Sequence, residues 1–215
     1  MPSLYEILRQ LQFITLELAI VGLFITGALI VLVGDWRVSL LALLGQYLLA
    51  GLVLSRLILP EIALIKALVG ALICPMLYLA ARQAGWGAGQ SWLATPARMT
   101  VFPGGLAFRL LGVILIALLA VTLNRGYPLP VIPRDVGLGS YWLMLSGLLV
   151  LMLSEEPLKA GQGLLTALVG FELLYASLER SLALVWLWAA VNLLLTLAIA
   201  YLVVVRGASS SEAEL

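Results

Sequence analysis

The sequence predicts an all-α protein, a polytopic transmembrane bundle of about seven helices. Of its 215 residues, 63% are hydrophobic and 11% are charged, whereas soluble domains have about half apolar and a quarter charged residues. The apolar residues form blocks of about 20, the length at which a helix crosses a hydrocarbon core of about 30 Å. The blocks lack the two-residue alternation of a β-barrel, and inside lipid only barrels and helices pair all of their backbone groups. Spanning helices are therefore expected.

Seven blocks are long enough to span a membrane. In chain order they cover residues 11–33, 38–59, 62–81, 106–123, 136–153, 161–178 and 182–205. The fifth block has a short apolar stretch, because prolines at 128–133 precede it and Glu155 follows it. If that helix began only at Tyr141, six spans would remain.

The remaining segments divide the chain into units. Residues 1–10 read as an interfacial segment without the features of a cleaved signal peptide, and residues 207–215, GASSSEAEL, as a disordered tail. Between them lie a first three-helix unit at 11–81, loops and a linking helix at 82–135, and a second three-helix unit at 136–206. The arrangement is three, one and three helices.

The two three-helix units resemble each other. Each has a very short polar link before its last helix, and the last helices contain the similar runs MLYLA and IAYLV. Laying Gln46 over Glu172 brings Lys66 over Asn192. We therefore expect a 3+1+3 pseudo-repeat, with chance similarity of apolar sequences as the alternative.

Composition also limits the function. A net charge of +1 offers no basic surface for nucleic acid. Without histidine and with the single cysteine Cys74, the usual haem, zinc and iron–sulfur ligand sets are missing, so no cofactor or metal is expected. No nucleophile elbow or phosphate loop occurs, so we expect no catalysis by the chain alone. Lys and Arg divide about equally between the two sides, so the positive-inside rule gives no orientation.

Glu172, in VGFELLYAS, is the leading functional residue. A carboxylate deep in a span costs about 2.5 kcal/mol or more on insertion scales, so it needs a partner, a water path or a purpose. Tyr175 and Glu179 follow on the same side of the helix and predict a line along which a proton or hydrated ion could leave. The alternative is a protonated carboxyl that is hydrogen-bonded to a neighbouring helix.

Lys66 and Asn192 are the other polar residues expected inside spans. Lys66 lies about one and a half turns into its helix, with Gly70 on the same face, where a neighbour could approach closely. An inward Lys66 would pair with Glu172 or exchange protons itself; the alternative is that its long stem reaches the interface. Asn192 could assist, or serve only as a hydrogen bond between helices.

Other features receive structural interpretations. Pro75 should remove one helical hydrogen bond, and a kink is preferred over a polar cavity. Charged residues near span ends are expected at the interface: Glu17, Arg56, Glu61 and Arg109. Tryptophans near span ends are expected in an aromatic belt: Trp36, Trp86, Trp92 and Trp142.

The segment 148–205, with the VGFELLYAS helix and the closing AVNLLLTLAIAYLV helix, resembles the K subunit of respiratory complex I. It is also similar to the C subunit of Mrp-type cation/proton antiporters and to component E of group 4 membrane-bound hydrogenases; the chain length favours the last. The resemblance implies that Glu172 matches the glutamate of the family's middle helix. The family's second glutamate would fall near Asn192, which cannot exchange a proton near neutral pH. Lys66 would then supply the second titratable group.

The resulting hypothesis is an accessory membrane subunit of such a complex, which helps protons or cations to move along a hydrated polar axis. Its partners would be antiporter-like subunits and quinone- or hydrogenase-module subunits, in a prokaryotic inner membrane or another energy-transducing membrane. Two alternatives stay open. One is a stand-alone small transporter, and the other is a structural scaffold in which Glu172 is only a buried hydrogen bond.

Overall fold

A computed structural model describes residues 16–57, 60–85, 105–127, 133–179 and 181–212. These residues form seven α-helices and no strand, as expected for an all-α bundle. The helices are α2 (Leu16–Leu32), α3 (Trp36–Leu57), α4 (Pro60–Gln83), α5 (Leu106–Gly126), α6 (Arg134–Leu153), α7 (Pro157–Leu178) and α8 (Leu182–Glu212). The predicted interfacial segment 1–10 lies outside the described residues.

Six of these helices, α3 to α8, are long and apolar enough to cross a membrane. The seventh, α2, is apolar but has only 17 residues within the described part of the chain. The protein is therefore an integral, multi-pass membrane protein. The fifth block has full spanning length, as α6, and residues 11–15 of the first block lie outside the described residues.

Helix α6 corrects two expectations. It begins at Arg134, directly after Pro133, because a proline just before or within the first turn costs a helix no hydrogen bond. The alternative start at Tyr141 is wrong. Trp142 consequently lies in the middle of the helix, is 2% exposed, and stacks on Phe24 with ring centroids 4.8 Å apart. Its expected place in an interfacial aromatic belt is wrong as well.

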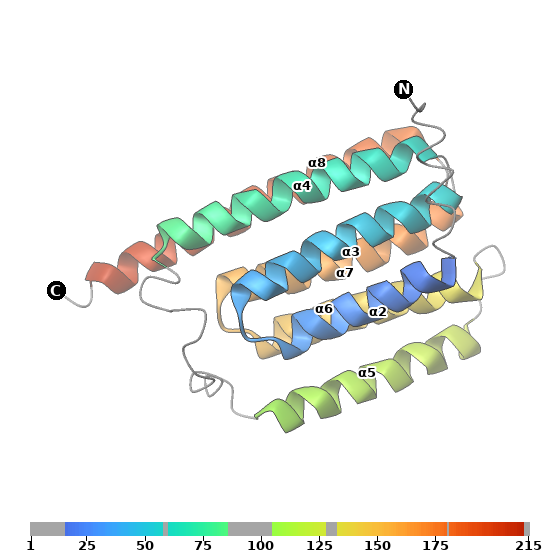
Figure 1. Ribbon diagram of the computed structural model, residues 1–215, viewed down its shortest axis with the longest axis horizontal. Helices are drawn as coiled ribbons and strands as arrows, with labels where there is room; N and C mark the ends of the chain where they lie inside the picture. Colours follow the sequence, from blue (N-terminus) through green and yellow to red (C-terminus); the bar gives the residue numbers. More distant parts are fainter. Residues whose placement is uncertain (1–15, 58–59, 86–104, 128–132, 180, 213–215) are drawn as a thin grey trace.

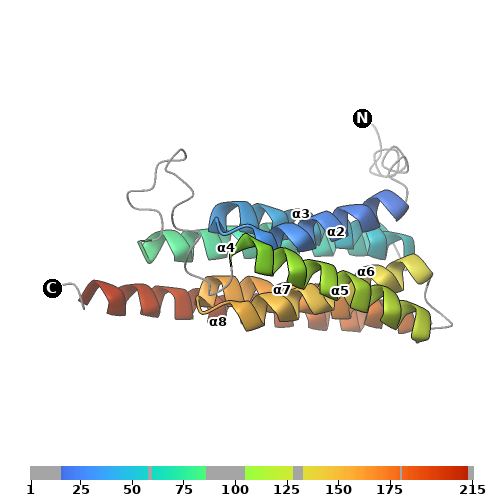
Figure 2. The same ribbon diagram turned by 90° about the horizontal axis from the view of Figure 1, so that it is seen from below.

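The two three-helix units form two layers (Figures 1 and 2). Helices α2, α3 and α4 make one layer and α6, α7 and α8 the other, and each helix packs against its counterpart: α2 on α6, α3 on α7 and α4 on α8. The linking helix α5 lies at one edge of the bundle against α6 and α2.

Each helix of the first unit has a counterpart in the second. The expected alignment of Gln46 with Glu172, however, does not match the positions of these residues within α3 and α7. Helices α3 and α7 both have 22 residues. Gln46 is the eleventh residue of α3, whereas Glu172 is the sixteenth residue of α7. At about 1.5 Å per residue, the two side chains are offset by roughly 7 Å along their helices.

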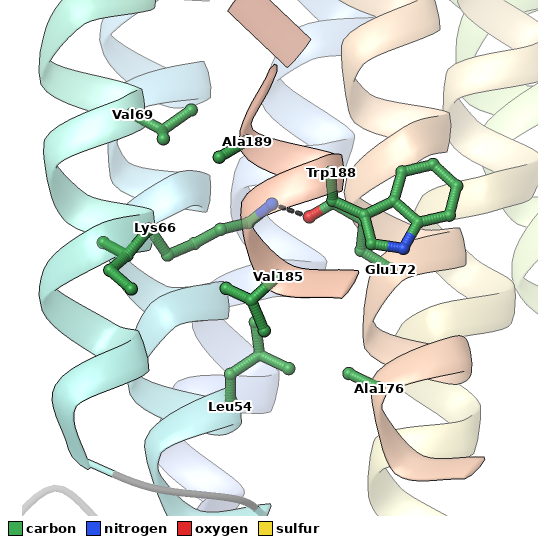
Figure 3. A pocket seen from close by; sticks show the side chains of 9 residues that line it. Leu54, Lys66, Val69, Glu172, Ala176, Val185, Trp188 and Ala189 are labelled. Atoms are coloured by element: carbon green, nitrogen blue, oxygen red, sulfur yellow. Dashed lines mark ion pairs between the residues drawn. The ribbon is translucent and has the colours of Figure 1, made fainter. Parts of the chain in front are cut away.

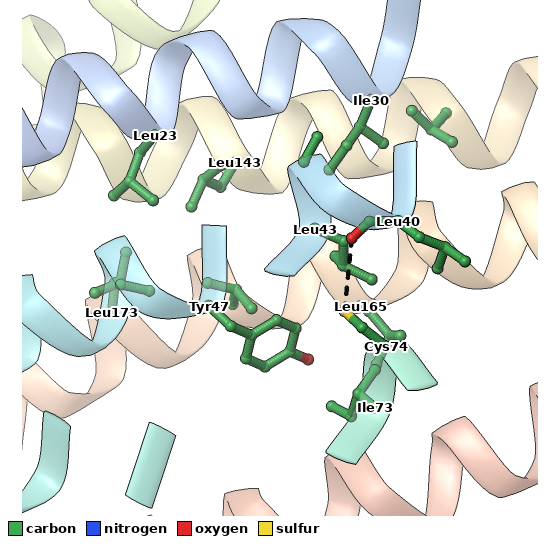
Figure 4. Packing of buried hydrophobic residues seen from close by; sticks show 14 of the residues in the cluster. Leu23, Ile30, Leu40, Leu43, Tyr47, Ile73, Cys74, Leu143, Leu165 and Leu173 are labelled. Carbon is green, nitrogen blue, oxygen red and sulfur yellow. Dashed lines mark hydrogen bonds between the residues drawn. The ribbon is translucent and has the colours of Figure 1, made fainter. Parts of the chain in front are cut away.

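Glycines bring α6 and α7 into backbone contact. A Cβ atom on Gly147 would collide with the backbone of Ala167 and Gly163, and one on Gly170 would lie 2.7 Å from the Met144 nitrogen and the Ser140 oxygen. Without a hydrophobic force between helices in lipid, such close approach is a principal source of packing energy. The buried leucines and Tyr47 fill the space between the layers (Figure 4).

Two further segments test the sequence expectations. Helix α8 continues to Glu212, so disorder is the wrong prediction for residues 207–212; no proline occurs there to end the helix. Gly207 packs against Ala84 near the end of α4. Helix α4 runs through Pro75 without interruption, and Pro75 faces outward.

Candidate functional site: a buried ion pair between the two layers

Lys66 and Glu172 form an ion pair inside the bundle (Figure 3). Lys66 is the seventh residue of α4, and Glu172 lies six residues before the end of α7. At about 1.5 Å per residue, both lie roughly 9 Å from the nearer helix ends. The two residues are 6% and 4% exposed, so Lys66 does not extend to the interface. Each charge instead offsets the cost of burying the other.

Asn192 of α8 ties the pair to a third helix. Its side-chain Nδ2 donates to Glu172 Oε1 and, at 2.8 Å, to the Trp188 carbonyl oxygen. Its Oδ1 accepts a 2.7 Å hydrogen bond from the Tyr47 hydroxyl. The fully buried amide thus uses both of its donors and its acceptor. Asn192 therefore fixes the orientation of the Glu172 carboxylate and links α8 to α3 and α7.

Tyr47 completes the site from α3. Its ring lies under the ammonium group, with Lys66 Nζ 5.1 Å from the ring centroid, a distance at which a cation–π interaction is favourable. Gly70, one turn after Lys66, permits this packing, because a Cβ atom there would lie 2.5 Å from Tyr47 Cβ. The close approach expected at Gly70 is confirmed. Four helices thus contribute one polar side chain each.

A small cavity borders the ion pair (Figure 3). The space open to the centres of water molecules is about 30 Å³, and about 10–15 Å³ of such space holds one water. The cavity could hold about two. It lies around the pair, with Leu54, Ala176 and Val185 on the side of the near helix ends and Val69 and Ala189 on the other side. The pair therefore borders a space of sufficient size for water.

The five predicted pathway residues do not all meet. Lys66, Glu172 and Asn192 come together as described. Tyr175 packs with Phe171 and Trp188, at centroid distances of 5.9 and 6.3 Å, and does not line the cavity. Glu179 is exposed, one residue beyond the end of α7. Between Glu172 and Glu179 on the same helix, the residue that lines the cavity is the apolar Ala176.

The charged residues expected at the interface are placed as follows. Glu17 and Arg56 are exposed, and the side chain of Glu61 lies outside the described part. Arg109 is half-buried, and its Nη1 donates to the Leu32 carbonyl oxygen at 3.2 Å. A cation at the last carbonyls of a helix is favourable, so Arg109 stabilises the end of α2.

Sequence reasoning missed a second polar cluster at the opposite ends of α3 and α7. Lys159 is 9% exposed, and its Nζ donates to Ser39 Oγ at 2.9 Å and to the Val33 carbonyl oxygen at 2.8 Å. Ser39 Oγ in turn donates to Gln162 Oε1 at 2.6 Å. The signal was the spacing of Lys159, Gln162 and Thr166, which lie on one face of α7.

Replacing Tyr47 with phenylalanine tests the Asn192 connection. Removal of the hydroxyl leaves Asn192 Oδ1 buried without a donor, which costs about 1–3 kcal/mol. We expect a lower midpoint of thermal unfolding in detergent. Tyr201→Phe is the control, because Tyr201 is 68% exposed and its change should have little effect. Equal midpoints for both variants would mean that the Tyr47–Asn192 bond contributes nothing to stability.

Comparison with known proteins adds no identification. No known protein family, no curated protein and no solved structure matches the chain.

Proposed function

We propose that this chain is an accessory, cofactor-free membrane subunit of an ion-translocating assembly. The assembly would be of the complex I-like, Mrp antiporter-like or membrane-bound hydrogenase-like type, with antiporter-like and quinone- or hydrogenase-module subunits as partners. Its place would be a prokaryotic inner membrane or another energy-transducing membrane. The observation that carries the proposal is the buried Lys66–Glu172 pair beside a cavity large enough for water.

The chemistry of the pair supports proton movement. A carboxylate can take up a proton and an ammonium group can release one, whereas the Asn192 amide only orients its neighbours. A proton that reaches Glu172 through the cavity removes the negative charge and with it the Coulomb attraction to Lys66. The positive charge left at Lys66 then favours release of the proton. The pair would thus act as a charge switch, with Asn192 and Tyr47 holding the geometry.

Glu172→Gln tests the relay. Glutamine keeps the shape and can still accept from Asn192, but it cannot exchange a proton. In the complex isolated from native membranes and reconstituted in vesicles, we expect proton or cation translocation to fall by about 100-fold or more, the range typical of a lost acid–base group. Glu17→Gln is the matched control, because Glu17 is exposed in the first turn of α2. Undiminished translocation by Glu172→Gln would exclude the relay role.

The partners are tested separately. After gentle detergent extraction, the tagged chain should co-migrate in native separation with antiporter-like, quinone-module or hydrogenase subunits at fixed stoichiometry, identified by mass spectrometry. A lone chain or a homo-oligomer that is stable across detergents would contradict the subunit proposal.

The second candidate is a stand-alone transporter. It is favoured by the packing of each helix of the first unit on its counterpart in the second, since repeated units that meet at a central site are common among transporters. This candidate requires substrate uptake by the purified chain in liposomes, without any other subunit.

A further inference from the structure

The Lys66–Glu172 pair lies much nearer to one membrane face than to the other. Glu172 is six residues from the end of α7 and fifteen from its start at Pro157, or roughly 9 Å and 22 Å along the helix. Over the longer distance the cavity extends only to Val69, three residues after Lys66, and Ala189. A proton that crosses the membrane through this chain needs a second path over the longer distance.

We infer that the contact between α3 and α7 carries a water-mediated proton path from Glu172 to Lys159 at the opposite face. The inference rests on the proposed function of Glu172. It goes beyond that function because it assigns Gln46, Gln162 and Thr166 to proton transfer, and because it lets one chain connect both faces.

The outer end of this path is already hydrogen-bonded. Lys159 donates to Ser39, and Ser39 donates to Gln162, at 2.9 and 2.6 Å. Ser39 and Gln162 are fully buried. The bonds run inward from the face where α3 and α7 begin, so a continuous polar connection reaches Gln162.

Beyond Gln162, the buried polar atoms have no protein partner. Gln162 Nε2, Thr166 Oγ1 and both side-chain polar atoms of Gln46 lack a hydrogen bond within the described part of the chain, and all three residues are 0% exposed. Leaving such a group without a partner costs about 1–3 kcal/mol each. Water with two to four polar partners is the ordinary way in which proteins satisfy them.

The Thr166 hydroxyl lacks a hydrogen bond that the other threonines in the described helices make. The hydroxyls of Thr26, Thr122 and Thr196 each donate to the carbonyl oxygen four residues earlier, at 2.7–2.9 Å. That bond is available to any helical threonine. The Thr166 hydroxyl does not make it, so it is free to bond water between the helices.

Further polar groups lie along the two helices between Gln162 and Glu172. Helices α3 and α7 run in the same direction, since they meet at Ser39 and Gln162 near their starts and at Leu54 and Ala176 near their ends. Seven residues after Ser39, Gln46 is therefore level with the apolar Val169, between Thr166 and Glu172. The next residue, Tyr47, reaches Asn192 and through it Glu172.

The groups differ in what they can do with a proton. Amides and hydroxyls orient water but do not take up or release protons near neutral pH. Gln46, Gln162 and Thr166 would hold a file of water, and the proton would move along it between Glu172 and the Lys159 end. Apolar replacements should therefore remove the water and with it the path.

Thiol accessibility tests whether water reaches this contact. In a Cys74→Ala background, Thr166→Cys is compared with Leu165→Cys, its neighbour in the apolar core at the same depth. The full chain is placed in sealed vesicles, silver ion is added to either face, and remaining thiols are labelled with a maleimide after denaturation. Because the thiolate is the reactive form, only a hydrated thiol should be blocked.

We expect silver from the Lys159 face to abolish labelling of Thr166→Cys and to leave Leu165→Cys labelled. The proposed water path would be wrong if the two cysteine variants were labelled equally after silver treatment. It would also be wrong if silver blocked Thr166→Cys only when added to the opposite face. If Thr166→Cys is not recovered in folded form, Gln162→Cys takes its place, with the same expected outcomes.

A transport measurement separates this inference from the proposed function. Thr166→Val should lower translocation by the complex, whereas Thr122→Val, on the exposed face of α5, should not. If Glu172→Gln stops translocation while Thr166→Val and thiol accessibility show no path, the relay stands and the path to Lys159 is wrong. If silver reaches Thr166→Cys but Glu172→Gln translocates normally, the water path stands and the proposed function is wrong.

Discussion

Gly147→Ala should lower the midpoint of thermal unfolding by roughly 2–12 °C, since overpacking costs about 1–3 kcal/mol and each kcal/mol shifts the midpoint by about 2–4 °C at this size. The added methyl group would overlap the Ala167 backbone nitrogen and the Gly163 carbonyl oxygen. Backbone atoms cannot move aside as a side-chain end can, so α6 and α7 must separate. The measurement is thermal unfolding in detergent, monitored by the intrinsic fluorescence of the protein.

Gly45→Ala is the matched control, because Gly45 lies in the middle of α3 and its added Cβ would meet only Thr26 Cγ2, at 3.6 Å. Alanine is favoured over glycine in a helix by about 1 kcal/mol, so this variant should be as stable as the original or more so. If Gly147→Ala were equally stable, the backbone contact between α6 and α7 would not be a source of stability.

Lys66→Met should destabilise the protein by about 3–5 kcal/mol, the range found when one partner of a buried ion pair is removed. Methionine fills much the same volume, so the loss comes from the Glu172 carboxylate, which keeps its bond from Asn192 but loses its cation. The measurement is the free energy of unfolding in a titration with denaturing detergent.

The double variant Lys66→Met/Glu172→Gln isolates the interaction between the two charges. With both charges removed, no charge is left buried and unpaired, and stability should return to near that of the original chain. The two single changes should therefore be strongly non-additive. If the double variant lost the sum of the two single losses, the charges would not interact in the folded state.

The fold class was predictable because lipid leaves few solutions. Blocks of apolar residues of spanning length can only be helices, and short links between them enforce antiparallel neighbours. The choice of partner across the layers was harder to predict. It depends on close contacts such as Gly147 against Gly163, and a single glycine in an apolar sequence does not reveal which helix it meets.

The central pair was predictable for a physical reason, and the second cluster was missed for a related one. Glu172 and Lys66 stand out because a charge deep in a span needs compensation. Lys159 lies at the start of α7, where hydropathy alone assigns it to the interface, yet it is 9% exposed. Tyr47 was missed because its contact with Asn192 joins residues far apart in the sequence.

The sequence overlay of Gln46 on Glu172 illustrates a further limit. It aligned two polar residues of two similar units, whereas the helix bounds of α3 and α7 offset them by five residues. Similar composition allows several alignments of apolar helices, and only the positions of the helix ends discriminate between them.

Helix α8 is held mainly by α4 and has a smaller contact with α7. It nevertheless carries Asn192, which holds the Glu172 carboxylate on one side and accepts from Tyr47 on the other. Hydrogen bonds weaken steeply beyond their normal length, so an outward movement of α8 by one or two ångströms breaks both bonds together. The electrostatic surroundings of the buried Glu172 carboxylate therefore depend on the position of α8.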